Sequence, residues 1–291
     1  MKQRPEDEVS CTPKATKVGM IGCGNMGRSM VTAWLKRGTL EPRQLLISAR
    51  SSAEATAAAL GVSARSTPAL LNEADVIILG FKPQQLDAVV ESLSAEPEAG
   101  LSGAVTPKLI LSLLAGVTLA QLRRALVGVG LVHADSVFVR LMPNLPAHRS
   151  VGATLAYSER ALGPENLAQV TSLLEALGAV EWLSSEGLFD VGTAISGCGP
   201  AYMFMIIEAL ADAGVSLGLP RDTAQRLAAQ TMLGSGVMGL HEHPGVLKDR
   251  VTSPGGVTIQ GVRALERAGI RSAMIEAVVC AAERSRSLGD A

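Results

Sequence analysis

The chain has 291 residues, of which 47% are hydrophobic and only 3% aromatic, and its 26 Lys and Arg residues nearly balance its 27 Asp and Glu residues. A nearly neutral chain of this length forms one large or two medium domains with a buried core, and it lacks the basic excess expected of a nucleic-acid or membrane-surface binder. No uninterrupted apolar run reaches the roughly 18 residues of a spanning segment, so we expect no transmembrane helix.

The first 16 residues are predicted to form a flexible polar tail. Its acidic triplet, Glu6 to Glu8, is typical neither of a secretory signal nor of an acid-poor transit peptide. The cysteines are scattered and form no Cys-x-x-Cys pair, which is typical of reduced thiols in a reducing compartment; they are Cys11, Cys23, Cys198 and Cys280. We therefore expect a cytoplasmic protein.

Short apolar segments alternate with segments of helical periodicity in the first half of the chain. In chain order, the pattern predicts a strand at 17–21, a helix at 25–37, a strand at 45–48, a helix at 51–60, a strand at 75–79, a helix at 84–94, a surface loop at 94–107 and a strand at 109–114. Alternation of this kind with buried strands predicts an α/β fold, in which a doubly wound parallel sheet of Rossmann type has right-handed crossovers.

From about residue 184 the pattern becomes almost purely helical. Helices are predicted at 200–217, 221–240, 258–268 and 271–288, separated by Gly and Pro. We therefore predict a dinucleotide-binding domain at 17–183 and an all-helical dimerisation and substrate-binding domain at 184–291. Helices this apolar in a small domain are expected to pack against a second copy of the chain.

A glycine-rich turn follows the first predicted strand and opens the first predicted helix, with the sequence Gly22-Cys23-Gly24-Asn25-Met26-Gly27. In this strand–turn–helix context the pattern indicates dinucleotide binding. The first glycine makes the tight turn, the second lets the backbone approach the pyrophosphate, and the third lets the helix pack on its strand.

The end of the second predicted strand favours NADPH over NADH. NAD-binding sites usually carry an acidic residue there for the ribose 2′-hydroxyl, whereas this chain has Ser48-Ala49-Arg50-Ser51-Ser52. Arg50 offers a fork-shaped cation for a 2′-phosphate and Ser51 offers a hydroxyl at a helix start. NADH stays possible, and Arg50 can also be read as a solvated surface residue.

Two further loops follow strands at the edge where open α/β sheets bind their ligands. They are Phe81-Lys82-Pro83 and Ala115-Gly116, and we predict that both contact the cofactor. Lys82 has three possible roles, as a proton donor, a strand-end charge or a cofactor contact, and we favour the contact.

The segment Ser253-Pro254-Gly255-Gly256-Val257-Thr258 precedes a predicted helix and has the composition of a helix start. Free backbone N–H groups and the helix dipole at such a start favour a carboxylate or a phosphate. Taken alone, the first four residues could equally form an ordinary N-cap turn.

Over residues 17–288 the chain resembles the pyrroline-5-carboxylate reductases, which catalyse the last step of proline biosynthesis. The resemblance rests on the glycine turn, Phe81-Lys82-Pro83, Met142-Pro143-Asn144, the Ser196–Tyr202 and Gly218–Arg221 segments and, most specifically, the run from His243 to Thr258. It implies that Asn144 belongs to the cofactor site. It also implies a dimer with intertwined helical domains, often in a larger ring such as a decamer, in which each active site combines one subunit's cofactor domain with its partner's helices.

The chemistry implied is hydride transfer to the imine carbon of 1-pyrroline-5-carboxylate. We expect the substrate carboxylate on the N–H groups of Gly255, Gly256 and Val257 with help from the Ser253 hydroxyl. The resemblance assigns the ring nitrogen to the Thr258 hydroxyl, although a threonine in a helix can instead bond back to its own helix. No metal site is expected, since the four histidines show no metal-binding spacing beyond His241-x-His243, which precedes a proline in a polar loop and is interpreted as solvated.

Two alternatives to the reductase stay open. A β-hydroxyacid-type dehydrogenase is expected to carry a lysine acid in a long helix, and segment 200–217 has none. A non-catalytic NADP sensor on the same fold is the other alternative. Within that segment Glu208 and Asp212 lie four residues apart and repel each other, so we expect each to have a contact, such as a donor of a partner chain, and we favour this over a paired acid/base role.

Overall fold

The computed structural model describes residues 16–50, 52–95 and 106–289, and it separates into two compact units. We call the first the sheet unit; it comprises residues 1–141 and 158–177. The second, which we call the helical unit, comprises residues 142–157 and 178–291. Residues 142–157 and 178–183 thus belong to the helical unit, although the boundary predicted near residue 183 places them in the first domain. The domains 17–183 and 184–291 stay a prediction, which limited proteolysis would test.

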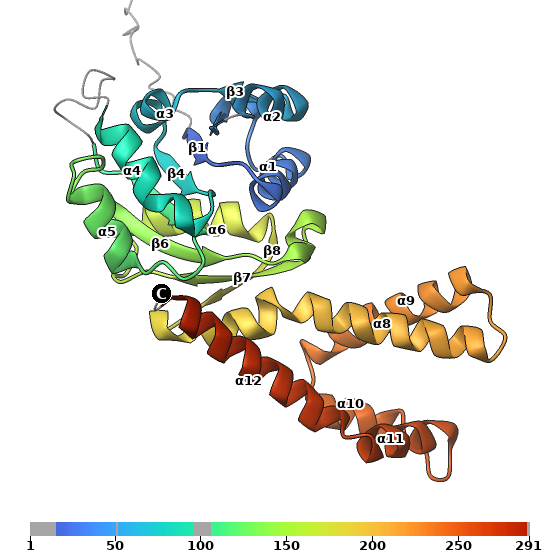
Figure 1. Cartoon of the computed structure of the whole chain (residues 1–291). Coiled ribbons are helices and arrows are strands. Elements are labelled where there is room, and N and C mark those ends of the chain that lie inside the picture. The colour runs from blue at the N-terminus through green and yellow to red at the C-terminus, as the bar shows by residue number, and fades with distance from the viewer. Residues whose placement is uncertain (1–15, 51, 96–105, 290–291) are drawn as a thin grey trace, which may run out of the picture. The chain divides into compact units, whose positions relative to one another are not determined.

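The sheet unit contains a parallel sheet with the strand order β3-β2-β1-β4-β5-β6 (Figure 1). Its strands are β1 (Val18–Ile21), β2 (Leu45–Ser48), β3 (Ser63–Ala64), β4 (Val76–Leu79), β5 (Leu109–Ser112) and β6 (Val137–Met142). All residues of β1, β2, β4 and β5 are buried, as expected for parallel strands that are covered on both faces. The order reverses between β1 and β4, which confirms the Rossmann-type doubly wound fold.

The helices of the sheet unit are α1 (Asn25–Arg37), α2 (Ala53–Leu60), α3 (Thr67–Glu73), α4 (Leu86–Ser94), α5 (Leu119–Val127) and α6 (Pro164–Glu175), with 3-10 turns η1 (Pro42–Gln44) and η2 (Pro83–Gln85). Helix α1 has the predicted bounds because Gly38, at a φ of 69°, ends it with a left-handed cap. The indole N–H of Trp34, which is fully buried, donates to the Leu173 carbonyl oxygen at 2.7 Å and ties α1 to α6.

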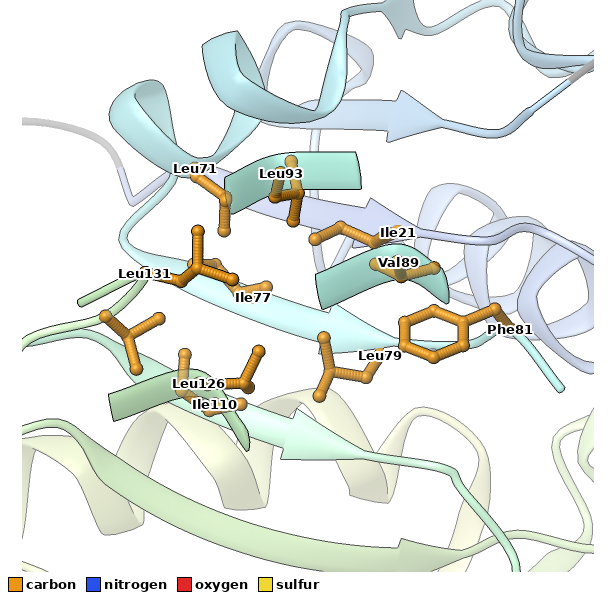
Figure 2. Close-up of a pocket in the computed structure, with 11 residues that line it drawn as sticks. Ile21, Leu71, Ile77, Leu79, Phe81, Val89, Leu93, Ile110, Leu126 and Leu131 are labelled. Atoms are coloured by element: carbon orange, nitrogen blue, oxygen red, sulfur yellow. The ribbon is translucent and has the colours of Figure 1, made fainter. Parts of the chain in front are cut away.

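An apolar layer fills the space between the sheet and helices α4 and α5. Figure 2 shows side chains of β1, β4 and β5, among them Ile21, Ile77 and Ile110, facing Leu93 and Leu126 of these helices. The gap among them measures about 10 Å³ and has no polar lining. A space of this size accommodates at most one water molecule and offers it no hydrogen-bond partner. The gap therefore belongs to the core and not to a ligand site.

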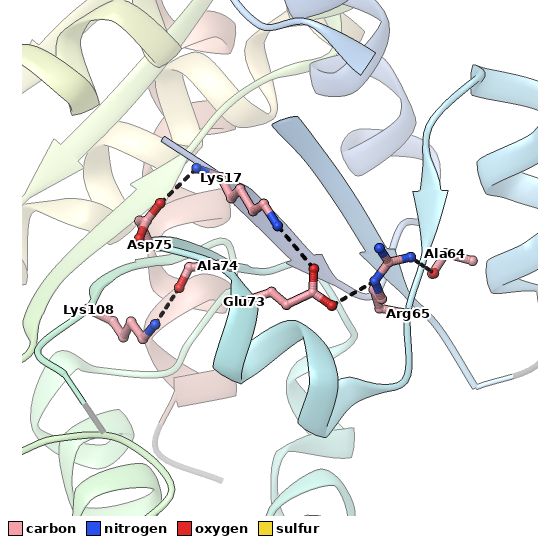
Figure 3. A network of polar contacts seen from close by, with 7 residues as sticks. All are labelled: Lys17, Ala64, Arg65, Glu73, Ala74, Asp75 and Lys108. Atoms are coloured by element: carbon pink, nitrogen blue, oxygen red, sulfur yellow. Dashed lines mark hydrogen bonds and ion pairs between the residues drawn. The ribbon is translucent and has the colours of Figure 1, made fainter. Parts of the chain in front are cut away.

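A polar network holds the amino ends of the central strands (Figure 3). The Glu73 carboxylate at the end of α3 accepts from Lys17 at 3.2 Å and from Arg65 at 2.8 Å, and these bonds hold the pKa of Glu73 below its usual range. The buried ammonium of Lys108 donates to the Ala74 carbonyl oxygen at 2.6 Å. Lys17, Ala74 and Lys108 precede β1, β4 and β5, so their contacts lie at the sheet edge opposite to the loops that follow these three strands.

The helical unit begins with two parallel strands, β7 (Gly152–Tyr157) and β8 (Gly178–Trp182), and the 3-10 turn η3 (Leu145–Arg149). The remainder is helical, as predicted: η4 (Glu186–Leu188), α7 (Phe189–Gly192), the π-helix η5 (Thr193–Gly197), α8 (Gly199–Ser216), α9 (Arg221–Gly239), α10 (Pro244–Arg250), α11 (Val257–Arg267) and α12 (Ile270–Gly289). Helices α8 and α9 lie side by side as a hairpin, and α12 packs against α7 and η5 (Figure 1).

The helical unit leaves most of its large apolar side chains exposed in the single chain. Where α8 meets α9, the buried cluster consists of the alanines Ala211, Ala224 and Ala228. In contrast, Met205 is 69% exposed and Leu240 is 80% exposed. By length and composition alone, the run Glu186–Ser216 is long and apolar enough to cross a membrane. Its most apolar stretch has a mean hydropathy of 1.4, and 11% of that stretch is buried within the chain. The expected absence of a transmembrane helix therefore stays a prediction.

Candidate functional site

The loops that carry the predicted cofactor residues converge at one edge of the sheet. The last residues of β1, β2 and β4 stand in register, since Ile21 pairs with both Ser48 and Leu79, and Leu79 pairs with Ser112 of β5. The glycine turn, the Arg50 segment, Phe81-Lys82-Pro83 and Ala115-Gly116 each come within three residues of the end of their strand. Parallel pairing thus gathers four sequence-distant segments at the edge where such sheets bind ligands.

Gly22 makes a turn that no other residue fits. Its φ is 83°, and its N–H donates to the Ser48 carbonyl oxygen at 2.7 Å. A Cβ atom at this position would lie 2.6 Å from the backbone nitrogen of Phe81. The close approach of the two loops and the left-handed backbone each require glycine here.

The two later glycines of the turn have opposite surroundings. A Cβ atom at Gly27 would lie 2.6 Å from Met20 Sδ, so this glycine lets α1 pack on β1. A Cβ atom at Gly24 would meet nothing within 4 Å. Gly24 precedes Asn25 and Met26, the first two residues of α1, and the first turn carries neither a side-chain cap nor an acidic residue. Its free N–H groups and open approach fit the pyrophosphate of a dinucleotide.

Cys23 places a neutral thiol in this turn. Burial raises the pKa of the Cys23 thiol to about 11, and the nearby positive charge of Arg28 opposes part of that rise. The thiol consequently stays protonated near neutral pH and places no negative charge beside the helix start. A thiolate at this point would repel a phosphate group.

The end of β2 carries hydroxyl groups and a cation in place of the carboxylate typical of NAD sites. The Ser48 and Thr67 hydroxyl groups lie 2.6 Å apart. Arg50 is exposed and makes no hydrogen bond or ion pair with the described residues. Ser51, the other residue predicted to bind the 2′-phosphate, lies outside the described residues. The helix after it begins at Ala53, two residues later than predicted.

The remaining predicted cofactor residues of the sheet unit lie at the same edge. Lys82 is exposed before η2, and its backbone N–H donates to the Gln85 side chain at 3.1 Å. Exposure suits an ammonium that contacts a bound group better than one that acts as a desolvated acid. Pro83 is the first residue of η2, and Gly116, at a φ of 74°, turns the chain next to the exposed Ala115.

Asn144 belongs to the helical unit and is engaged within it. It is 8% exposed; its side-chain amide donates to the Ser196 carbonyl oxygen at 2.9 Å and accepts from the Ala153 N–H at 2.9 Å. These bonds join the start of β7 to the π-helix, a structure common at functional sites. Sequence periodicity did not reveal this π-helix. A cofactor contact by Asn144 stays a prediction, whereas its role in positioning the π-helix is observed.

The segment after α10 forms a type II turn that shapes the start of α11. Pro254 and Gly255 are its central residues, Gly255 has a φ of 65°, and the Gly256 N–H donates to the Ser253 carbonyl oxygen at 3.0 Å. Because the Gly256 N–H is used within the turn, the predicted donors to the substrate carboxylate are reduced to the N–H groups of Gly255 and Val257 and the Ser253 hydroxyl. The Ser253 hydroxyl lies so close to Gly256 that a Cβ atom there would be 2.2 Å from it.

Thr258 is the second residue of α11, which begins one residue earlier than the predicted range 258–268. Its side chain is exposed, and its hydroxyl makes no hydrogen bond with the described residues, so back-bonding to its own helix is not observed. Val257 before it is 91% exposed. The start of α11 therefore offers backbone donors, a free hydroxyl and an apolar side chain on one open surface.

Asp212 of α8 has a contact, as expected, but its donor belongs to the same chain and not to a partner. Arg221, the first residue of α9, forms an ion pair with Asp212 within the same chain. The turn between the helices brings them together, which their spacing alone could not reveal. Glu208 is exposed and unpaired among the described residues.

The sheet order, the glycine turn and the helical unit define a dinucleotide-dependent oxidoreductase with a helical dimerisation region. In agreement, residues 17–115 match a family model described as NADP oxidoreductase coenzyme F420-dependent, and residues 186–288 match one described as pyrroline-5-carboxylate reductase dimerisation. The chain is 37% identical to a pyrroline-5-carboxylate reductase of Synechocystis over 94% of its length and 98% of the relative's. This chain belongs to the pyrroline-5-carboxylate reductase family.

Further relatives agree over nearly the whole chain. The Escherichia coli pyrroline-5-carboxylate reductase is 38% identical over 94% of this chain and 98% of its own length. The solved structure of the Coxiella burnetii pyrroline-5-carboxylate reductase has a TM-score of 0.81 at 33% identity and covers 94% of this chain and 99% of that one. That of a Plasmodium falciparum pyrroline carboxylate reductase with NADP bound has a TM-score of 0.78 at 27% identity, over 94% and 98% of the two chains.

Proposed function

We propose that this protein reduces 1-pyrroline-5-carboxylate to L-proline with NADPH, the last step of proline biosynthesis. The single observation that carries the proposal is the coexistence of an open glycine turn on a Rossmann-type sheet with the exposed type II turn at α11 in a member of this family. The first feature fits a hydride-donating dinucleotide and the second fits a small carboxylate. NADH is the second possible cofactor.

The residues of the sheet unit hold the cofactor in this proposal. When bound, the reduced nicotinamide supplies a hydride for the imine carbon. Gly24 leaves room for the pyrophosphate at the N-terminus of α1, and Arg50 binds the 2′-phosphate. The loops at Phe81-Lys82-Pro83 and Ala115-Gly116 face the nicotinamide side. Hydride transfer from a reduced nicotinamide does not require a metal ion. Among the described residues there is no cluster of three or more possible metal ligands.

The start of α11 holds the imino acid. The N–H groups of Gly255 and Val257 and the Ser253 hydroxyl bind the carboxylate, while Gly256 shapes the turn through its own hydrogen bond. Hydride addition to the imine carbon moves the C=N electron pair onto the ring nitrogen. The Thr258 hydroxyl donates to this nitrogen as it takes up its proton, and solvent water restores any proton that the hydroxyl gives up. Much of the rate enhancement then comes from orientation of the two reactants. The proposal requires the dinucleotide and this turn to meet, in one chain or across a dimer.

Loss of NADPH absorbance in the presence of pyrroline-5-carboxylate tests the reaction, with proline measured as product. Thr258→Ala should lower kcat by roughly 100-fold, the lower range for loss of a positioned proton donor, and Thr258→Ser should restore part of it. Thr223→Ala, a threonine at the start of α9, is the matched control and should leave kcat unchanged. An unchanged kcat in Thr258→Ala would remove Thr258 from the mechanism.

The two alternative functions predict different outcomes of this assay and of a parallel one with a β-hydroxyacid and NADP⁺. Binding of NADPH without turnover would favour a non-catalytic NADP sensor. Oxidation of a β-hydroxyacid with reduction of NADP⁺, in the absence of proline formation, would favour the β-hydroxyacid-type dehydrogenase. The family membership of the whole chain supports the reductase over both.

We further propose that the exposed apolar faces of α8, α9 and α12 pack against a second chain, and that dimers assemble into a decamer. The family's dimerisation region covers these helices, and Met205, at 69% exposure, is one of several apolar residues that a partner would cover. Sedimentation should show decamers for the wild type and smaller species for Met205→Glu. A location in the cytoplasm, inferred from the scattered cysteines, is testable by cell fractionation.

A further inference from the structure

Arg28 links the first turns of two helices at the dinucleotide edge. Its guanidinium donates through Nη2 to the Thr56 hydroxyl at 2.7 Å. Thr56 lies on α2 and is 1% exposed, so the hydroxyl is a fixed acceptor. Arg28 itself is exposed. The contact therefore holds the cation in place without burying it.

The position of Arg28 directs this cation toward the bound nucleotide. Arg28 follows Gly24 by four residues, so it lies on the same face of α1 as the open pyrophosphate approach. Side chains on a helix lean toward its N-terminus, which is the end that faces the ligand edge. Thr56 follows Ser52, the N-cap of α2, by the same spacing. Arg28 thus spans the starts of the two helices that flank the end of β2.

The charged side chains near the end of β2 give a net positive charge, which suits a dianion. Arg50 stands at the end of β2, and Glu54, exposed in the first turn of α2, carries the opposing charge. Without a further cation, the charges of Arg50 and Glu54 would cancel. Arg28 adds a second cation, and only one of the five N–H donors of its guanidinium is used by Thr56. The usual carboxylate for a free ribose 2′-hydroxyl is missing from the end of β2.

We propose that Arg28, held by Thr56, is a second cation for the 2′-phosphate of NADP and a determinant of the preference for NADPH over NADH. This inference rests on the proposed function, because it assumes that the edge binds a dinucleotide. Arg50 approaches the phosphate from the strand end and Arg28 approaches it from between the two helices. Thr56 is a positioning residue that acts through Arg28.

Calorimetric titration of NADP⁺ and NAD⁺ into the intact protein tests the inference without any turnover. Arg28→Gln should weaken NADP⁺ binding by roughly 10- to 100-fold, the range for loss of a hydrogen bond to a charged group, and change NAD⁺ binding by less than about twofold. Lys36→Gln removes an exposed cation at the far end of α1 and should alter neither. Thr56→Val keeps the charge and frees the side chain, so it should weaken NADP⁺ binding to an intermediate degree.

The same titrations separate failure of this inference from failure of the proposed function. A wild-type protein that binds neither nucleotide would refute the proposed function itself. Wild-type binding of NADP⁺ that Arg28→Gln leaves unchanged would refute only the role of Arg28. Equal weakening of NADP⁺ and NAD⁺ would also refute it, since that result would place Arg28 on the pyrophosphate. Circular dichroism of each variant shows whether the fold is retained, and Thr56→Val, which removes no charge, serves if Arg28→Gln does not fold.

Discussion

Alanine at Gly22 and alanine at Gly24 should fail in different ways, because the two glycines have different surroundings. At Gly22 a side chain must accept a φ of 83°, which costs roughly 1–2 kcal/mol, and its Cβ atom would lie 2.6 Å from the Phe81 backbone, which costs roughly another 1–3 kcal/mol. The sum of roughly 2–5 kcal/mol is a large part of a typical unfolding free energy of about 5–15 kcal/mol.

At Gly24 the backbone is extended and the Cβ atom would meet nothing within 4 Å. Alanine is a poorer N-cap than glycine by up to about 1 kcal/mol, but the loss of unfolded-state entropy offsets roughly 0.4–1 kcal/mol, so stability should hardly change. The methyl group instead occupies the approach to the helix N-terminus and should abolish measurable NADPH binding. Thermal unfolding by circular dichroism and calorimetric NADPH titration measure the two effects. Wild-type affinity in Gly24→Ala would refute the assignment of Gly24 to the pyrophosphate.

Three further substitutions test the structure away from the glycine turn. Asn144→Ala removes two hydrogen bonds to partly buried backbone groups and should lower the unfolding free energy by roughly 1–3 kcal/mol in urea titrations. Glu73, whose pKa is lowered chiefly by its hydrogen bond with Arg65, stabilises the fold above the ordinary glutamate range and loses this effect as pH falls through its lowered pKa; Glu73→Gln should therefore lower Tm at pH 7, and the difference in Tm between the variant and the wild type should shrink as the pH is lowered. Arg221→Ala breaks an exposed ion pair with Asp212 and should change stability by less than about 1 kcal/mol in the same titrations.

Features set by neighbouring residues could be predicted from the sequence, and those set by distant contacts could not. Helix α1 has the predicted bounds because a glycine turn starts it and Gly38 ends it. The strand at β8 was missed because it is half-exposed and lacks an apolar run. Its position depends on Gly178, where a Cβ atom would lie 2.1 Å from the Gly152 carbonyl oxygen. The role of Asn144 likewise depends on Ser196, 52 residues away.

The candidate site follows the same division. The glycine turn and the α11 turn each consist of consecutive residues whose chemistry is local, so their positions at helix starts could be predicted. The sequence could not predict that the Gly256 N–H forms a hydrogen bond within the α11 turn. Nor could it predict that Thr56 on α2 holds the Arg28 cation in place. Arg28 shows the consequence, because nothing in the glycine pattern marks it and only the contact with Thr56 brings it to the start of α2.

The distribution of apolar residues in the helical unit explains why a second chain belongs to the functional protein. Alanines fill the contact between α8 and α9, which lets the two helices approach closely but buries little apolar area. The larger side chains, such as Met205 and Leu240, are exposed on the single chain. A soluble monomer rarely exposes large apolar patches, so we expect a protein partner to bury side chains such as these. Residues 186–288 match the family's dimerisation model, which supports the proposal that a second copy buries these side chains and extends the small alanine core of this unit.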